Sequence, residues 1–399
     1  MMWKRGRVAT RVQISPSAYE VAYRLDGWGG LIDRAFVAQW NALAADCVEP
    51  NAFCESWFLQ PALRQFDAHG SVKIFTLWDG DQLCGLMPLS LKRRYGRWLM
   101  PHFQNWMHHN AFLGTPLVRA GYEDIFWQNL LGALDDRPGG ALFFHLYGLN
   151  VDGALKAALQ RVTDGQRRRM ECVEDKARAF LDGDQSPEAY FENAVRAKKR
   201  KELRRQKNRL MDEGILTFLR QEDDEGVDAW ATEFLALEQK GWKGANGSAL
   251  SCQAETRNLF VEVLRGAAAC GQLERLELRL NDKPLAMLVN FLCPPGSFSF
   301  KTAFDEDFAR YSPGVLLQIE NLALLERKDI RWSDSCAAEG HPMIDSLWTG
   351  RRHVGRYSVA IGGAGRRAVF GRLVNAELAR NALRNAKLPA HLHEEEGEL

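Results

Sequence analysis

The chain has 399 residues, of which 46% are hydrophobic and 26% charged, so it can bury a substantial core in one or two domains. A formal net charge of only +1 excludes a strong overall attraction to nucleic acid or membrane, and any basic surface must be local. Eight cysteines without CxxC or CxxH pairs argue against a zinc module or a disulfide framework and favour a reducing compartment.

No segment has the pattern of an export signal or a membrane span. The first 21 residues are basic but lack the apolar run of a secretory signal. Residues 98–118 form a long uncharged window that is too polar for a transmembrane helix. We therefore expect a cytoplasmic protein that could lie against the inner membrane.

The two halves of the chain repeat one order of elements: two helices, antiparallel strands, a helix and a strand. In the first half the patterns predict helices at 31–45, 56–66 and 122–134 and strands at 72–78, 82–91 and 141–148. In the second half they predict helices at 227–239, 254–269 and 315–327 and strands at 273–280, 284–292, 298–304 and 329–334. This duplication predicts an α/β protein of two similar domains.

The predicted boundaries follow from this repeat. Residues 1–25 are an N-terminal extension, 26–180 the first domain, 181–370 the second, and 371–399 a C-terminal helix with a disordered acidic tail. Residues 187–214 read as one long helix, capped by Ser186 and closed by Gly214, with nine Lys or Arg between Arg196 and Arg209. A solvated connecting helix explains most of these charges, and a basic surface for phosphates of a cofactor, lipid headgroup or RNA is the functional alternative.

Residues 297–327 are the most informative stretch, because a strand is followed by a turn and a helix. Phe298, Phe300, Thr302 and Phe304 alternate with small or polar residues, as in a half-buried strand. Ser312 is a natural N-cap and Pro313 suits the first helical position. We expect a diphosphate to bind the free N–H groups at the positive end of this helix, those of Gly314, Val315 and Leu316 beside Arg310. An ordinary strand-to-helix turn is the alternative.

The segments ARYSPGVLL and IRWSD, with the strands before them, resemble the acyl-CoA-binding core of the GNAT superfamily of N-acyltransferases. The segments KKRKELRRQKNRL, LEQKGWKGANGSAL and DSCAAEGHPMIDSLWTGRR resemble, more narrowly, a bacterial two-GNAT group that includes CelD-like proteins of polysaccharide clusters and bacterial ceramide synthases. The resemblance covers about residues 26–361. It implies two tandem GNAT-like domains, each a mixed, mostly antiparallel sheet flanked by helices.

The resemblance also implies acyl-CoA as co-substrate, no permanently bound cofactor and no metal. The coenzyme A diphosphate would be held by residues of the second domain: Arg310, Ser312, Gly314, Val315 and Leu316. The family's Arg-x-x-Gly-x-Gly loop is altered here, since Arg310-Tyr311-Ser312-Pro313-Gly314 has a single glycine. The first domain lacks a phosphate-loop signature.

Amine acylation by a thioester needs a neutral amine, a polarised carbonyl and a proton donor for the leaving thiolate. In the GNAT arrangement this chemistry lies where the strand before the turn separates from the strand after the helix. Asp334 is the first candidate for general base, and His341 could also take the proton. Tyr311 is a candidate acid, and Cys336 a weaker one. Each of these has an ordinary structural role as its alternative.

Five further side chains are candidates for substrate binding in the second half or at the domain interface. Glu238 precedes a GWKG segment whose Trp242 and Lys243 suit a flexible lid over an acyl chain or phosphate. Lys301 lies on the strand that faces the reaction. His109 could orient substrate; with His102 and His108 it also suggests a metal, which we discount because no carboxylate or cysteine completes the set.

Twelve tryptophans, several beside basic residues, favour contact with an anionic membrane interface. We therefore expect the acceptor to be a lipid or sphingoid-base amine, acylated in ceramide and sphingolipid synthesis, and no specific nucleic acid as a partner. One alternative is an N-acetyltransferase or a scaffold of exopolysaccharide or cellulose biosynthesis. Another is an aminoacyl-tRNA-dependent transferase like the FemAB proteins, in which the basic helix would bind RNA.

Overall fold

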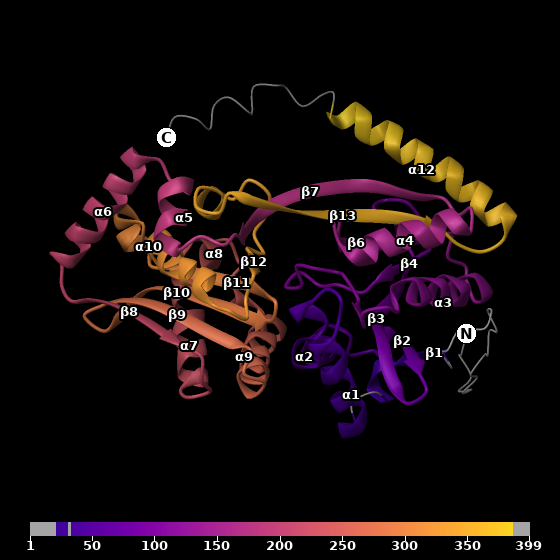
Figure 1. The fold of residues 1–399 in the computed structure, drawn as a ribbon, viewed down its shortest axis with the longest axis horizontal. Coiled ribbons are helices and arrows are strands. Elements are labelled where there is room, and N and C mark those ends of the chain that lie inside the picture. Colours follow the sequence, from indigo (N-terminus) through magenta and orange to yellow (C-terminus); the bar gives the residue numbers. More distant parts are fainter. Residues whose placement is uncertain (1–20, 31–32, 386–399) are drawn as a thin grey trace.

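One continuous mixed sheet runs through both halves in the computed structural model, which describes residues 21–30 and 33–385. Its strand order is β1-β2-β3-β4-β6-β13-β7-β12-β11-β10-β9-β8, with β5 paired to β3. Helices cover the sheet on both sides (Figure 1). The predicted class, a tandem α/β fold with mixed, mostly antiparallel strands flanked by helices, is confirmed.

The first half runs from β1 to β7. Its strands are β1 (Val21–Gly27), β2 (Lys73–Asp79), β3 (Gln82–Lys92), β4 (His102–Asn105), β5 (Leu117–Val118), β6 (Phe143–Asn150) and β7 (Met170–Asp182). Its helices are α1 (Arg34–Ala45), α2 (Ser56–Phe66), α3 (Glu123–Asp136) and α4 (Ala154–Gly165).

The second half follows through two short helices. Its strands are β8 (Leu216–Gln221), β9 (Leu273–Leu280), β10 (Lys283–Cys293), β11 (Gly296–Phe304), β12 (Trp332–Asp334) and β13 (Gly350–Ala360). Its helices are α5 (Pro187–Ala194), α6 (Ala197–Met211), α7 (Val227–Lys240), α8 (Trp242–Ala245), α9 (Ala254–Ala269), α10 (Pro313–Glu320), α11 (Pro342–Asp345) and α12 (Ala364–Asn385).

The two halves have the predicted repeat of elements. In the first half β4 and β6 are parallel neighbours with α3 between them in the chain, and in the second half β11 and β12 are parallel neighbours with α10 between them. Each parallel pair is preceded by antiparallel strands. The repeat therefore extends to the direction of the strands.

The halves exchange their last strands. β7 follows the first half in the chain but pairs with β12 of the second, whereas β13 follows the second half and pairs with β6 of the first. β7 and β13 also pair with each other over ten registered positions. Figure 1 shows this long ribbon crossing between the halves. The exchange makes one sheet out of two.

A single aromatic core joins the halves beneath this sheet. Helices α1 and α2 of the first half and α7 and α9 of the second bury their apolar faces in the same cluster. The ring of Phe53 lies 5.5 Å from that of Phe298, and the ring of Trp57 lies 4.9 Å from that of Phe291. At the edge of the core the Trp57 indole donates to Gln272 at 2.8 Å.

Two predicted helices differ in the structure. Residues 187–214 form two helices, because Val195 adopts extended backbone (φ −110°, ψ 124°) and buries its side chain in the core under β7. The Arg200 guanidinium donates to the Val195 carbonyl at 2.7 Å, satisfying an acceptor that the broken helix leaves free. The helix expected at 315–327 is α10 followed by a 3₁₀ segment, Asn321–Glu326.

Two predicted segments lie partly outside the residues that the structure describes. Residues 1–20 of the expected N-terminal extension and 386–399 of the expected acidic tail lie outside the described residues. The domain boundaries stay a prediction. Within residues 21–30 and 33–385, no helix is both long and apolar enough to cross a bilayer.

Candidate active site

The parallel strands β11 and β12 separate after three paired positions. Pairing runs from Gly296 opposite Trp332 to Phe298 opposite Asp334. β12 ends there, whereas β11 continues to Phe304. We call the region beside residues 299–304 the strand opening. It is the place where the sequence predicted the reaction.

A β-bulge in β11 lies at the strand opening. Ser299 and Lys301 lie opposite successive residues of β10, so Phe300 is the extra residue between them. A bulge shifts the alternation of side chains and re-aims them. Phe298 and Phe300 accordingly pack in the core shared by the halves, whereas Phe304 packs against the core beside α10. The strict alternation predicted through Phe304 is therefore wrong beyond the bulge.

Lys301 places a cation among aromatic side chains at this point. Its Nζ lies 5.1 Å from the ring centre of Phe112 and 5.5 Å from that of Phe300. Burial, and then the charge of Lys243, lower the pKa of Lys301 to about 8. An ammonium with this pKa is mostly protonated at neutral pH and releases its proton far more readily than an exposed lysine.

The first half supplies one side of this cluster through the segment that contains His108 and Phe112. The His108 ring lies 4.8 Å from the ring of Phe66 and 5.9 Å from that of Phe58. Burial, followed by the charges of His109 and Lys301, lowers the pKa of His108 to about 3, so its ring is neutral. His109, which the sequence favoured, is exposed. Across the described residues no group of three or more His, Cys, Asp or Glu could hold a metal ion.

Glu238 and Lys243 bind the GWKG segment to β11. The Lys243 ammonium donates to Glu238 Oε1 at 2.9 Å and to the Thr302 carbonyl at 3.3 Å. The other oxygen of Glu238 accepts from the backbone N–H of Leu250 at 2.8 Å. The predicted flexible loop is thus the short helix α8, fixed by a buried carboxylate. Glu238 has its partners within the protein.

The GWKG segment is tightly constrained, except at Trp242. A Cβ on Gly244 would lie 1.8 Å from the Gln239 carbonyl oxygen, so only glycine fits. Trp242 is 55% exposed, and its backbone N–H donates to Glu306 at 2.6 Å. A small hollow beside it is lined by α7, α8 and the end of β11. The Trp242 ring is therefore available to a ligand that reaches the strand opening from this side.

The turn before α10 offers two amides rather than three. Ser312 lies in the left-handed region (φ 54°, ψ 50°), and its side chain makes no capping bond. Its carbonyl accepts from the N–H of Leu316 at 3.0 Å, as the first helical bond requires. The prediction of a free N–H at Leu316 is therefore wrong, while those of Gly314 and Val315 belong to the unpaired first turn.

Gly314 is packed by its neighbours. A Cβ there would lie 3.0 Å from Sδ of Met343 and 3.3 Å from the Phe304 ring. Glycine therefore lets α10 approach α11 and β11 closely, and its missing side chain points at protein atoms. A side chain added at position 314 would therefore displace α10 rather than enter the space for phosphates.

Arg310 and Tyr311 face the end of α6. The Tyr311 hydroxyl donates to Glu213 Oε1 at 2.5 Å, and this bond is the first cause of the raised pKa of Tyr311. Arg310 is mostly exposed, donates to the same oxygen at 3.2 Å and stacks on Tyr311. Tyr311 thus ties the turn to the segment that follows the basic helix.

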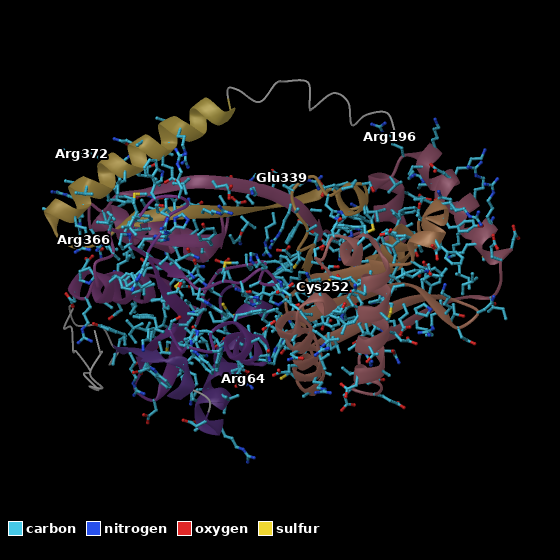
Figure 2. All side chains as sticks on the ribbon, turned by 180° about the vertical axis from the view of Figure 1, so that it is seen from behind. Arg64, Arg196, Cys252, Glu339, Arg366 and Arg372 are labelled. Atoms are coloured by element: carbon cyan, nitrogen blue, oxygen red, sulfur yellow. The ribbon has the colours of Figure 1, made fainter. Side chains whose placement is uncertain are left out.

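Helix α6 lies beside α10 (Figure 1) and carries most of the local positive charge. It begins after Arg196, labelled in Figure 2. Leu210 of α6 packs with Leu316 and Leu317 of α10 in one core. Exposed cations without an ion pair among the described residues are Lys198, Lys201, Arg204, Arg205 and Arg209. They form a basic surface next to the turn before α10, where the sequence predicted a diphosphate.

Asp334 does not fit the role of general base. Its Oδ2 accepts from Arg178 at 2.6 Å and from Arg352 at 2.8 Å, and its Oδ1 accepts from the Cys336 N–H at 2.9 Å. Burial alone would raise its pKa, but the charges of Arg178 and then Arg352 outweigh burial and lower it. A fully buried carboxylate held by two guanidiniums stays charged and is a poor proton acceptor.

Cys336 and His341 lie on the segment that follows β12. Burial, and then the charge of Asp334, raise the pKa of the Cys336 thiol, so it is neutral and unreactive. His341 precedes α11, whose Met343 contacts α10. The Nδ1 atom of His341 is buried and has no hydrogen-bond partner among the described residues. Its role as a proton acceptor stays a prediction.

The structure thus brings together Lys301, Lys243 and Glu238 at the strand opening, and the turn residues beside α6. Tyr311 is hydrogen-bonded to Glu213 and His109 is exposed, and their roles stay predictions. Sequence reasoning missed Arg178 and Arg352, whose partner Asp334 lies 156 and 18 residues away in the chain. It also missed Phe112, for which the run of histidines just before it was the only nearby signal.

Comparison with protein families finds one match in this part of the chain. Residues 197–341 match the model of the acetyltransferase (GNAT) domain. This region of the chain is therefore similar to the acetyltransferase (GNAT) domain. Because of this match and its tandem fold, we conclude that the protein is an enzyme of the acyltransferase type. The matched region contains α6, the strand opening, the turn and α10. None of the curated protein sequences matches the chain.

Solved structures share the fold at low sequence identity. The structure of FemX has a TM-score of 0.54 and 9% identity, with 81% of this chain and 95% of that chain covered. A conserved protein of unknown function from Bacteroides thetaiotaomicron has a TM-score of 0.50 and 12% identity, with 82% and 97% covered. A tandem GNAT protein from the clavulanic acid pathway has a TM-score of 0.44 and 14% identity, with 86% and 100% covered.

Proposed function

We propose that the protein transfers an acyl group from a coenzyme A thioester to an amine at the strand opening. The observation that carries this proposal is Lys301, a lysine of pKa about 8 held over Phe112 and Phe300 by a bulge in β11. The match of residues 197–341 to the acetyltransferase (GNAT) domain supports acyl-CoA chemistry in this region of the chain. No permanently bound cofactor or metal is required.

In this proposal the turn before α10 holds the diphosphate. The N–H groups of Gly314 and Val315 stand at the positive end of the helix, and Arg310 and the exposed cations of α6 lie beside them. Two amides and one exposed arginine bind a diphosphate more weakly than a glycine-rich loop does. The basic helix α6 supplies the remaining attraction.

Lys301 then acts on the thioester. The neutral amine of the acceptor attacks the carbonyl carbon, the C–N bond forms and the C–S bond breaks. The Lys301 ammonium stabilises the negative charge that develops on the carbonyl oxygen and protonates the departing thiolate. The proton lost by the attacking amine restores the ammonium, directly or through water. His341 is the second candidate for accepting that proton.

The acceptor that we propose is a lipid or sphingoid-base amine, which would make the product an amide-linked lipid of the ceramide type. Exposed apolar side chains support it, since Trp242 lies at the strand opening and Trp98 and Leu99 are 51% and 74% exposed. The basic surface of α6 would meet anionic headgroups, so we propose peripheral contact with an anionic membrane.

The basic surface of α6 also favours a second candidate function, transfer of an aminoacyl group from tRNA as in FemAB-like proteins. The FemX fold is compatible with it. The same cations that attract a diphosphate would attract an RNA backbone. Activity that requires aminoacyl-tRNA and disappears with ribonuclease would establish this second function and exclude the first.

Replacement of Lys301 by Met tests the proposed mechanism. We expect kcat with acyl-CoA and an amine acceptor to fall about 100-fold or more, with KM for acyl-CoA changed less than about threefold, because the lost charge acts on the transition state. The control is Lys328→Met, an exposed lysine outside the site, which should keep full activity.

The pH profile sharpens this test. The ratio of wild-type to variant kcat cancels the ionisation of the acceptor amine, and it should fall as pH rises through about 8, where Lys301 loses its proton. A ratio that stays flat from pH 6 to 10, or a variant with normal kcat, would rule out Lys301 as the acid.

A further inference from the structure

A large cavity lies far from the strand opening. It has a volume of about 590 Å³ and is enclosed by α12, by strands β6, β7 and β13, and by the segment 95–100. Figure 1 shows α12 lying across the β7–β13 ribbon over the first half, away from α10 and β11. We call this cavity the α12 groove. Its volume falls within the range of about 300–1,000 Å³ that is usual for small-molecule sites.

The floor of the α12 groove is apolar. Phe143 of β6 and Phe370 and Val374 of α12 are buried in one small cluster, and the rings of Phe143 and Phe370 lie 5.8 Å apart. Trp98 and Leu99 stand at the edge of the groove and are largely exposed. An alkyl chain lying over this floor would remove the exposed apolar edge of Trp98 and Leu99 from water, which a polar ligand would not do.

Polar groups occupy few places in the groove. The Tyr95 hydroxyl donates to Glu377 Oε1 at 2.5 Å and so ties the segment 95–100 to α12. Ser358 of β13 shares a hydrogen bond of 2.8 Å with Nδ1 of the buried His145. These pairs satisfy each other and hold the groove in shape. They leave the charged residues to recognise a ligand.

The charge balance of the groove favours an anion. Three arginines line it, Arg97, Arg356 and Arg380, against two carboxylates, Glu174 and Glu377. Glu174 accepts from Arg356 at 2.8 Å, and Glu377 accepts from Tyr95. Arg97 stacks on Trp98, and neither Arg97 nor Arg380 has an ion pair within the described residues. Two guanidiniums thus remain for a negative headgroup.

We propose that the α12 groove binds a single-chain amphiphile with an anionic headgroup, a fatty carboxylate or an alkyl phosphate. The alkyl chain lies against Trp98 and Leu99, over the floor of the groove, and the headgroup pairs with Arg97 and Arg380. The site is separate from the strand opening and does not depend on the acyl-transfer proposal. The amphiphile can be free in solution or come from a membrane. In both cases the groove recognises the alkyl chain and its anionic headgroup.

The test measures binding of dodecanoate and of dodecyl phosphate to the full chain by calorimetry, below their micelle concentrations. We expect saturable binding of one molecule per chain, with decanoate about 15-fold weaker than dodecanoate, since each of the two missing methylenes is worth about fourfold. Dodecyltrimethylammonium, with the same chain and opposite charge, should bind at least tenfold more weakly. Tighter binding of one anion identifies the headgroup.

Two matched pairs of variants locate the site. Ala376→Phe fills the groove from an exposed position of α12 and should weaken dodecanoate binding at least tenfold, whereas Ala379→Phe, an exposed alanine of the same helix outside the groove, should not. Arg380→Gln should weaken binding several-fold, but Arg372→Gln, labelled in Figure 2 and not in the groove lining, should leave it unchanged. Absent saturable binding, or equal losses within either pair, would overturn the proposal.

Discussion

Asp334 shows how the chemistry of one residue depends on partners that its local sequence does not reveal. From the sequence it stands beside the expected reaction, between two serines, as a plausible base. In the structure it is fully buried between Arg178 and Arg352, and the Arg352 guanidinium lies 4.2 Å from the centre of the Trp332 ring. Asp334 therefore binds three strands together at the seam between the halves.

Replacement of Asp334 by Asn should lower the free energy of unfolding by about 3–5 kcal/mol at pH 7, because two buried guanidiniums lose their counter-charge. Asp329→Asn, which removes an exposed partner of Arg327, should cost less than about 1 kcal/mol. Urea unfolding with fluorescence detection measures both. Normal stability with a selective loss of kcat would restore Asp334 as a catalytic base.

The acid dependence of the same variant has a definite sign. The pKa of Asp334 is lowered in the folded protein, so its ionised form stabilises the fold at every pH above its unfolded value of about 3.9. That contribution should be lost as pH falls below about 4, where the unfolded chain takes up the proton first. The difference between wild type and Asp334→Asn should therefore shrink in that window and stay constant from pH 5 to 8.

Among the elements, the turn and α10 were predictable in position, although their detail was not. Ser312-Pro313 correctly marked the start of a helix, because a proline without an N–H suits the first turn. The left-handed backbone of Ser312 and the packing of Gly314 against Met343 depend on α11, whose contact with α10 no local pattern predicts. The bulge in β11 likewise cannot be predicted from the sequence of β11 alone, because it is defined by the pairing with β10.

Gly314→Ala tests what this glycine does. The new Cβ would meet Met343 Sδ at 3.0 Å and push α10 away from α11, so KM for acyl-CoA should rise several-fold through a displaced turn. Shortening the neighbour in the double variant Gly314→Ala, Met343→Ala should restore KM to near its wild-type value. Steady-state kinetics of the two single variants and the double variant decide this, and a KM that does not recover would mean that position 314 contacts the ligand directly.

On the scale of the whole molecule, the repeat was predictable and the exchange was not. Apolar periodicity revealed the helices and strands of each half, because their core faces are strongly patterned. The sequence did not predict β7 and β13, because both strands carry many charged residues and are buried only towards one end. They therefore lack the apolar alternation of a half-buried strand. These two strands decide that the halves share a sheet, an ion-pair cluster and one aromatic core.

A shared core and exchanged strands should make the two halves one cooperative unit. Phe53 belongs to the first half, yet its ring contacts Phe298 and Phe300 of the second, so Phe53→Ala should remove about 3–5 kcal/mol from both. Hydrogen exchange of the most protected amides in β3 and in β10 measures this, and both sets should lose the same opening free energy. If only the amides of β3 exchange faster, the halves open separately, and the exchanged strands connect two independent domains without coupling their stability.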